Sequence, residues 1–122
     1  MKTPSQYDEK INRSAILERL EGNQELLIEV IQAFLEEAPQ LIEEMRKASR
    51  QGDMQELARS AHSMKGAAGN FLAYGTVSAA SQLEKDAKSE DASSAKVSLA
   101  ALEGAVEQLL PQLVDLCTES AK

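Results

Sequence analysis

Apolar residues recur at spacings of three and four over most of the chain, which is the pattern of helices with one buried face. Four stretches show it, and the first has apolar residues at Leu27, Val30, Ile31, Phe34, Leu41, Ile42 and Met45. The other three have them at Leu57, Ala61, Met64, Ala68 and Phe71; at Val77, Ala80, Leu83 and Ala87; and at Ala95, Leu99, Leu102, Val106, Leu109, Leu113 and Leu116. The pattern predicts four long helices and needs no strand.

Local signals predict where two of these helices begin. Asn23 is a good N-cap for a helix that reaches about Ser49. Asp53, with Glu56 three residues later, resembles a capping box in which a carboxylate replaces the usual hydroxyl, and it follows Gly52. We therefore expect the second long helix to start at Asp53.

A shorter helix is expected over roughly residues 12–20, closed by Gly22. Residues 1–10 are polar and are expected to form a flexible lead-in, and residues 119–122 a C-terminal tail. The domain proper would then span residues 11–118. The predicted fold is all-α, an antiparallel up-down four-helix bundle with a short additional N-terminal helix.

Two prolines fall inside the predicted helices. Pro39 lacks the N–H that would bond the carbonyl of Leu35, so a kink or a break at Ala38 is expected. Pro111 is expected to bend the last helix in the same way.

Length and charge exclude several classes of function. At 122 residues the chain is about one domain, too short for a kinase with its own nucleotide-binding domain. The chain has a net charge of −7 and no cluster of lysine or arginine, which argues against a function in binding nucleic acid. No run of about 18 apolar residues occurs, so we expect a cytoplasmic protein without a membrane span, and a monomer. Cys117 is the only cysteine and receives no role.

The candidate chemistry lies at residues 62–69, HSMKGAAG, which contain the only histidine. Lys65, three residues after His62, lies on the same helix face, where its ammonium would sit beside a phosphoryl group on the imidazole. Gly66 and Gly69 share this face, and each costs roughly 1 kcal/mol of helix stability relative to Ala. A bare strip beside a partly exposed histidine suits a phosphoryl carrier against which a partner protein docks.

A carboxylate is expected opposite this histidine. If the chain turns near Ala73, residues 11 positions to either side face one another, and these are His62 and Glu84. Glu84 could accept the Nδ1–H of the imidazole, which would leave Nε2 unprotonated and nucleophilic. Taken singly, each of these residues is more commonly a surface or packing residue, and it is their joint placement that favours the carrier.

The motif at residues 62–70, with residues 58–61 before it and 80–84 after it, resembles histidine-containing phosphotransfer (HPt) domains of two-component phosphorelays. Residues 20–27, with Phe34 downstream, are similar to the start of the family's long second helix. The resemblance covers roughly residues 11–115.

The resemblance implies a role for each residue of the motif. His62 would accept the phosphoryl group, Lys65 would steady it, and Glu84 would orient the histidine. Gly66 and Gly69 would admit a receiver domain.

The resemblance also implies the partners. These are response-regulator receiver domains and a hybrid sensor histidine kinase. Such domains have no autonomous kinase activity and bind no metal, because the Mg²⁺ belongs to the receiver. Arg59 and Leu72 are further candidates for the docking surface.

Other functions stay open from the sequence. A helical module could bind a receiver, or another signalling protein, without ever being phosphorylated, and substitution of His62 by Gln would then leave binding intact. An autonomous enzyme is disfavoured, because the chain has no HExxH motif, no nucleophile elbow and no glycine-rich phosphate loop after a strand. The chain could also be a domain of a larger sensor kinase or the phosphoacceptor part of a chemotaxis-type kinase.

Overall fold

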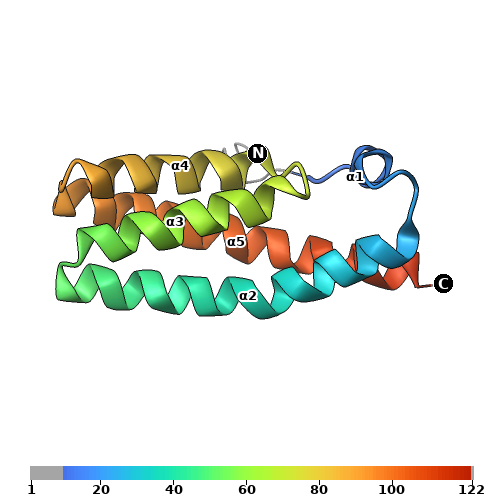
Figure 1. The fold of residues 1–122 in the computed structure, drawn as a ribbon, viewed down its shortest axis with the longest axis horizontal. Helices are drawn as coiled ribbons and strands as arrows, with labels where there is room; N and C mark the ends of the chain where they lie inside the picture. The colour runs from blue at the N-terminus through green and yellow to red at the C-terminus, as the bar shows by residue number, and fades with distance from the viewer. Residues whose placement is uncertain (1–9, 122) are drawn as a thin grey trace, which may run out of the picture.

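A computed structural model describes residues 10–121 and contains, over that range, five helices and no strand. The helices are α1 (Arg13–Arg19), α2 (Gln24–Gln51), α3 (Met54–Gly69), α4 (Tyr74–Lys88) and α5 (Ala92–Ser120). Figure 1 shows α2 to α5 side by side along the long axis, with the colour sequence running in alternate directions from one helix to the next. The prediction of an all-α fold is confirmed.

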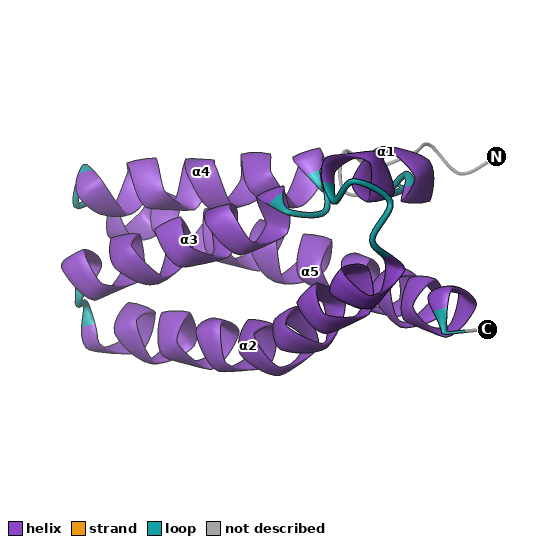
Figure 2. Cartoon of the chain, turned by 45° about the vertical axis from the view of Figure 1, so that its right-hand side comes forward, coloured by secondary structure: helices purple, strands orange, loops and turns teal. Residues whose placement is uncertain are grey.

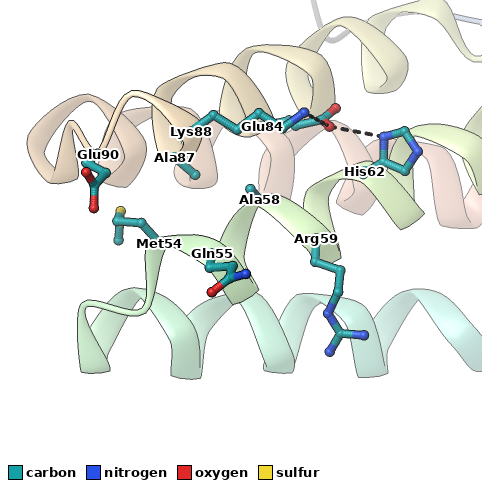
Figure 3. Close-up of a pocket in the computed structure, with 9 residues that line it drawn as sticks. All are labelled: Met54, Gln55, Ala58, Arg59, His62, Glu84, Ala87, Lys88 and Glu90. Carbon is teal, nitrogen blue, oxygen red and sulfur yellow. Dashed lines mark hydrogen bonds and ion pairs between the residues drawn. The ribbon is translucent and has the colours of Figure 1, made fainter.

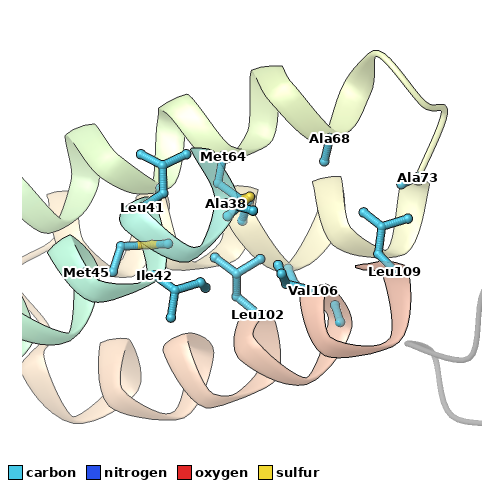
Figure 4. Close-up of a cluster of buried hydrophobic side chains, with 14 of the residues drawn as sticks. Ala38, Leu41, Ile42, Met45, Met64, Ala68, Ala73, Leu102, Val106 and Leu109 are labelled. Carbon is cyan, nitrogen blue, oxygen red and sulfur yellow. The ribbon is translucent and has the colours of Figure 1, made fainter. Parts of the chain in front are cut away.

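Helices α2 to α5 enclose a single core. Helix α3 packs against α2 and α4, and α5 packs against α4 and α2, so the four helices close on one another. Figure 4 shows side chains from the facing stripes meeting between the helices, among them Met45 of α2, Met64 of α3 and Leu102 of α5. All three are fully buried. Apolar residues spaced by three and four lie on one face of a helix, so the sequence predicts these stripes.

Side-chain caps explain where most helices begin. Asn12, Asn23, Asp53 and Asp91 each accept a hydrogen bond from the backbone N–H three residues later. The capping box at Asp53 is only half formed, because the Asp53 N–H donates to the carbonyl of Ala48 at 2.8 Å. That bond completes the end of α2 around Gly52, whose φ of +69° favours glycine.

The two prolines do not interrupt their helices. Helix α2 is continuous through Pro39 and α5 through Pro111, so the expected alternative of a break at Ala38 is wrong. The ribbon of α2 is bent along its length in Figure 2. A proline removes one hydrogen bond, and the buried stripes on both sides of it keep the helix packed.

The structure describes only the last residue of the expected lead-in, but most of the expected tail. Residues 1–9 of the expected lead-in lie outside the described residues, and Lys10 is exposed. Residues 119 and 120 of the expected tail are helical, because α5 runs to Ser120, and Ser120 is buried. Helix α2 likewise runs past Ser49, to Gln51.

Helix α1 lies at the end of the bundle where α3 turns into α4 (Figure 1). Its Ile16 is fully buried, and Arg19 donates from Nη1 to the carbonyl of Gly69 at 3.1 Å. This carbonyl belongs to the last turn of α3 and also accepts from the N–H of Leu72 at 3.1 Å. Arg19 therefore ties α1 to the C-terminal end of the helix that carries His62.

Candidate functional site

The hairpin of α3 and α4 brings His62 and Glu84 together. The turn between the two helices contains Phe71, which is fully buried, and Leu72, whose φ is +53°. Across the hairpin, Nδ1 of His62 lies 3.1 Å from Oε2 of Glu84. This is the pair that the turn near Ala73 predicts, because both helices run from that turn with the same rise per residue.

Glu84 is a buried carboxylate with three donors around it. Its side chain is 9% exposed. Oε1 accepts from Nζ of Lys65 at 2.9 Å, and Oε2 interacts with both Nδ1 of His62 and, at 2.9 Å, Nζ of Lys88. A buried carboxylate needs such partners, since an unpaired charge in the interior is costly.

These partners keep Glu84 ionised. The hydrogen bond from Lys65 contributes most, followed by that from Lys88, and together with His62 they lower the pKa of Glu84 from 4.5 to about 2. Burial acts in the opposite direction and is outweighed. Glu84 is therefore an acceptor at neutral pH and has no proton to donate.

The state of Glu84 determines the tautomer of His62. A carboxylate accepts only, so the interaction with Glu84 requires the proton on Nδ1 of the ring. The side chain of His62 is 67% exposed, and Figure 3 shows its other nitrogen on the side of the ring away from Glu84. A neutral His62 thus presents the lone pair of Nε2 to the surface, which is the arrangement of a nucleophile.

His62 stands between two grooves on the α3 and α4 surface. The larger groove has a volume of about 590 Å³ and is lined by Met54, Gln55, Ala58, Arg59, His62, Glu84, Ala87, Lys88 and Glu90 (Figure 3). The second, of about 490 Å³, is lined by His62, Lys65, Ser81, Glu84, Lys85, Lys88 and Ser89. The larger groove has two cations and two anions, and the second has three cations and one anion, although the whole chain has a net charge of −7. The surface around His62 therefore favours an anionic group.

The two glycines of the motif have open space beside them. A Cβ atom built on Gly66 or Gly69 would meet no atom within 4 Å, and neither residue has a positive φ. Close packing inside the domain therefore does not explain them, and neither does backbone strain. Both contribute bare backbone to the helix of His62, which leaves room for a partner.

The two other predicted docking residues lie in different settings. Arg59 is exposed and is engaged by Glu56, at 2.6 Å between Nη2 and Oε2, and in Figure 3 its side chain points away from Glu84. Leu72 is half-buried against the core and lies outside both grooves. Of these two residues, only Arg59 shares a groove with His62.

Lys88 belongs to the site but is not among the residues that the sequence motif predicts. It is four residues after Glu84 on α4, and a glutamate four residues before a lysine is a favourable pair on one helix face. That signal is present in the sequence. It points to the site only once Glu84 is known to face His62.

Residues 10–121 contain neither a cluster of candidate metal ligands nor a helix suited to span a membrane. Over that range no group of three or more His, Cys, Asp or Glu side chains is arranged to hold a metal ion. Within the same residues, no helix combines the length and the apolar character needed to cross a membrane.

Comparison of the sequence with models of protein families identifies one family. The sequence model of the Hpt domain matches residues 29–119, which include α3, α4 and nearly all of α2 and α5. The chain belongs to the Hpt domain family. Comparison of this Hpt domain with curated proteins and with solved structures gives no significant match.

Family membership defines the broad function. Hpt domains take part in histidine phosphotransfer in two-component phosphorelays, and they interact with the receiver domains of response regulators and kinases. The motif around His62, predicted from the sequence, lies inside the matched region.

Proposed function

We propose that this Hpt domain is a cytoplasmic, monomeric phosphoryl carrier built on an antiparallel four-helix bundle. His62 accepts a phosphoryl group from the phosphoaspartate of one receiver domain, such as that of a hybrid sensor histidine kinase, and passes it to the aspartate of another. The observation that supports this most strongly is the pairing of an exposed imidazole with a buried, ionised Glu84 through Nδ1. The domain is an intermediate in phosphotransfer and has no kinase activity of its own.

The chemical step uses the free nitrogen of the ring. The lone pair of Nε2 attacks the phosphorus of the aspartyl phosphate and an N–P bond forms. The P–O bond to the aspartate breaks, and its electron pair stays on the carboxylate of the receiver. The proton on Nδ1 does not move, so the ring gains a positive charge as the phosphoryl group arrives.

Glu84 and Lys65 complement the charges that this step creates. Glu84 accepts from the Nδ1–H of the ring, and the bond becomes charge-assisted when the ring turns cationic. Lys65 is one helical turn from His62, and its side chain is 33% exposed. Its Nζ donates one hydrogen bond to Oε1 of Glu84 and has two further N–H donors for the oxygens of the phosphoryl group, where positioned cations stabilise the transferred charge.

The partner supplies the remainder of the reaction. In this proposal the Mg²⁺ is bound by the acidic pocket of the receiver. Gly66 and Gly69 let that pocket approach the α3 backbone. Arg59 and, beyond the grooves, Leu72 contribute to the docking surface.

In the experiment, the chain is mixed with receiver domains that have been phosphorylated with acetyl phosphate. The expected result is phosphate on the chain that is labile in acid and stable in base, mapped by mass spectrometry to His62. His62→Gln is the matched control, because it keeps a polar side chain on an exposed position.

Two results separate the candidate functions. Phosphate on the chain that disappears in His62→Gln supports the carrier. Binding of several well-folded receivers without any phosphate on the chain contradicts it, and favours the docking module that is never phosphorylated.

A further inference from the structure

Lys88 is a charged residue of the site to which the carrier function assigns no role. Its Nζ lies 2.9 Å from Oε2 of Glu84, the same oxygen that faces Nδ1 of His62 at 3.1 Å. The ammonium and the imidazole are thus no farther apart than the sum of these two distances. Figure 3 shows the Lys88 side chain extended along α4 toward the carboxylate.

The charges around His62 come from both helices of the hairpin. Helix α3 contributes Arg59 and Lys65, and helix α4 contributes Glu84, Lys85 and Lys88; Glu90 follows the end of α4. The guanidinium of Arg59 is already engaged by the carboxylate of Glu56. The charged groups joined to His62 through hydrogen bonds and ion pairs are therefore one carboxylate and two ammonium groups.

Glu84 has two opposite effects on His62 as a nucleophile. A carboxylate beside an imidazole orients the ring, but it also favours the imidazolium, because opposite charges within about 4 to 6 Å stabilise each other. An imidazolium has protons on both nitrogens and no lone pair on Nε2 to attack phosphorus. Orientation and nucleophilicity thus make opposite demands on the charge of the site.

Lys65 alone offsets the negative charge of Glu84, and Lys88 adds a further positive charge. Lys65 and Glu84 together carry no net charge, whereas addition of Lys88 makes the cluster positive. The two ammonium groups pair with different oxygens of this carboxylate, Lys65 with Oε1 and Lys88 with Oε2. No other described residue has an ion pair with Oε2 besides Lys88 and His62.

We propose that Lys88 is a positioning residue that offsets the charge of Glu84, so that this carboxylate orients the His62 ring without holding a second proton on it. The proposal rests on the carrier function. It predicts that Lys88 matters for the protonation of His62 more than for the stability of the fold, since the Lys88 side chain is 67% exposed.

The experiment compares three variants with the parent chain. Lys88→Met removes the charge and keeps an unbranched side chain, and Lys88→Arg keeps the charge. Lys96→Met removes an exposed lysine of α5, and among the described residues the ion pair of this helix is formed by Glu103 with Arg46 and not by Lys96. Two-dimensional ¹H–¹⁵N spectra of the imidazole report tautomer and protonation, and His62 is the only histidine to assign.

The expected change follows from the distance. At low ionic strength, a unit charge at about 6 Å alters the ratio of imidazolium to neutral imidazole about threefold to tenfold. Lys88→Met should raise this ratio by that factor at fixed pH, while Lys88→Arg and Lys96→Met should leave it within twofold of the parent. The acidic limb of the transfer rate against pH should move upward by about half to one pH unit in Lys88→Met alone.

An unchanged ratio in Lys88→Met, or an equal rise in Lys96→Met, overturns the role of Lys88. The spectra need no partner protein and no phosphate, so failure of the carrier function would appear separately, as the absence of phosphate on His62 in the parent chain.

Discussion

Replacement of Glu84 by Gln tests the electrostatics of the site through the stability of the fold. Glutamine has nearly the same shape but carries no charge at any pH, so Glu84→Gln removes the ion pairs with Lys65 and Lys88. The pKa of Glu84 is lowered from 4.5 to about 2 in the folded chain. The folded state therefore gains from the ionised carboxylate above pH 4.5, and this gain is lost as the pH falls toward 2.

The magnitude follows from the size of this change. Taken in full, the lowered pKa corresponds to about 3 kcal/mol. The two lysines are 33% and 67% exposed, so water screens their charges and we expect about 1 to 2 kcal/mol. Urea unfolding of the parent chain and of Glu84→Gln should show that difference in the free energy of unfolding at pH 7.

The pH dependence is the sharper part of this test. The difference between the two proteins should shrink to less than half by about pH 3, because the unfolded chain takes up the proton first. The other carboxylates are common to both proteins and cancel in the difference. A difference that is absent at pH 7, or constant from pH 7 to pH 3, would refute the reasoning.

Three further substitutions test the fold and the docking face. Gly66→Ala should raise the free energy of unfolding by about 0.5 to 1 kcal/mol, because a Cβ there meets no atom within 4 Å. The same substitution should slow phosphoryl transfer from a phosphorylated receiver. Lower stability in urea would mean that Gly66 serves internal packing. Asp53→Ala should cost about 1 kcal/mol in the same assay through loss of the cap on the Glu56 N–H, and no loss would show that the cap contributes nothing. Leu102→Ala should cost about 2 to 5 kcal/mol, because Leu102 is fully buried in the core; thermal unfolding at the parent temperature would contradict that placement.

Much of this fold follows from the sequence for local reasons. The stripe from Leu57 to Phe71 and the cap at Asp53 act within one helix, so the sequence alone predicts the face and the start of α3. The pairing of His62 with Glu84 is also predictable, because a short turn between two helices fixes which residues face each other. The continuity of α2 through Pro39 is not, since it depends on packing against α3 and α5.

The electrostatics of the site depend on side-chain rotamers that a helix pattern does not fix. The sequence predicts Lys65 beside a phosphoryl group on His62, and in the structure its Nζ donates to Oε1 of Glu84. Lys88 joins the same carboxylate from α4, which brings two lysines to one acid. Helix periodicity tells which residues share a face, but which of several nearby cations reaches a buried carboxylate is decided by tertiary contacts.

The measurement that tests the central claim most directly is a ³¹P and ¹⁵N spectrum of the chain after it has been charged by a receiver domain. The account predicts one phosphorus signal coupled to Nε2 of His62, with the proton retained on Nδ1 beside Glu84. Phosphorus bonded to Nδ1, or to any side chain other than His62, would contradict it.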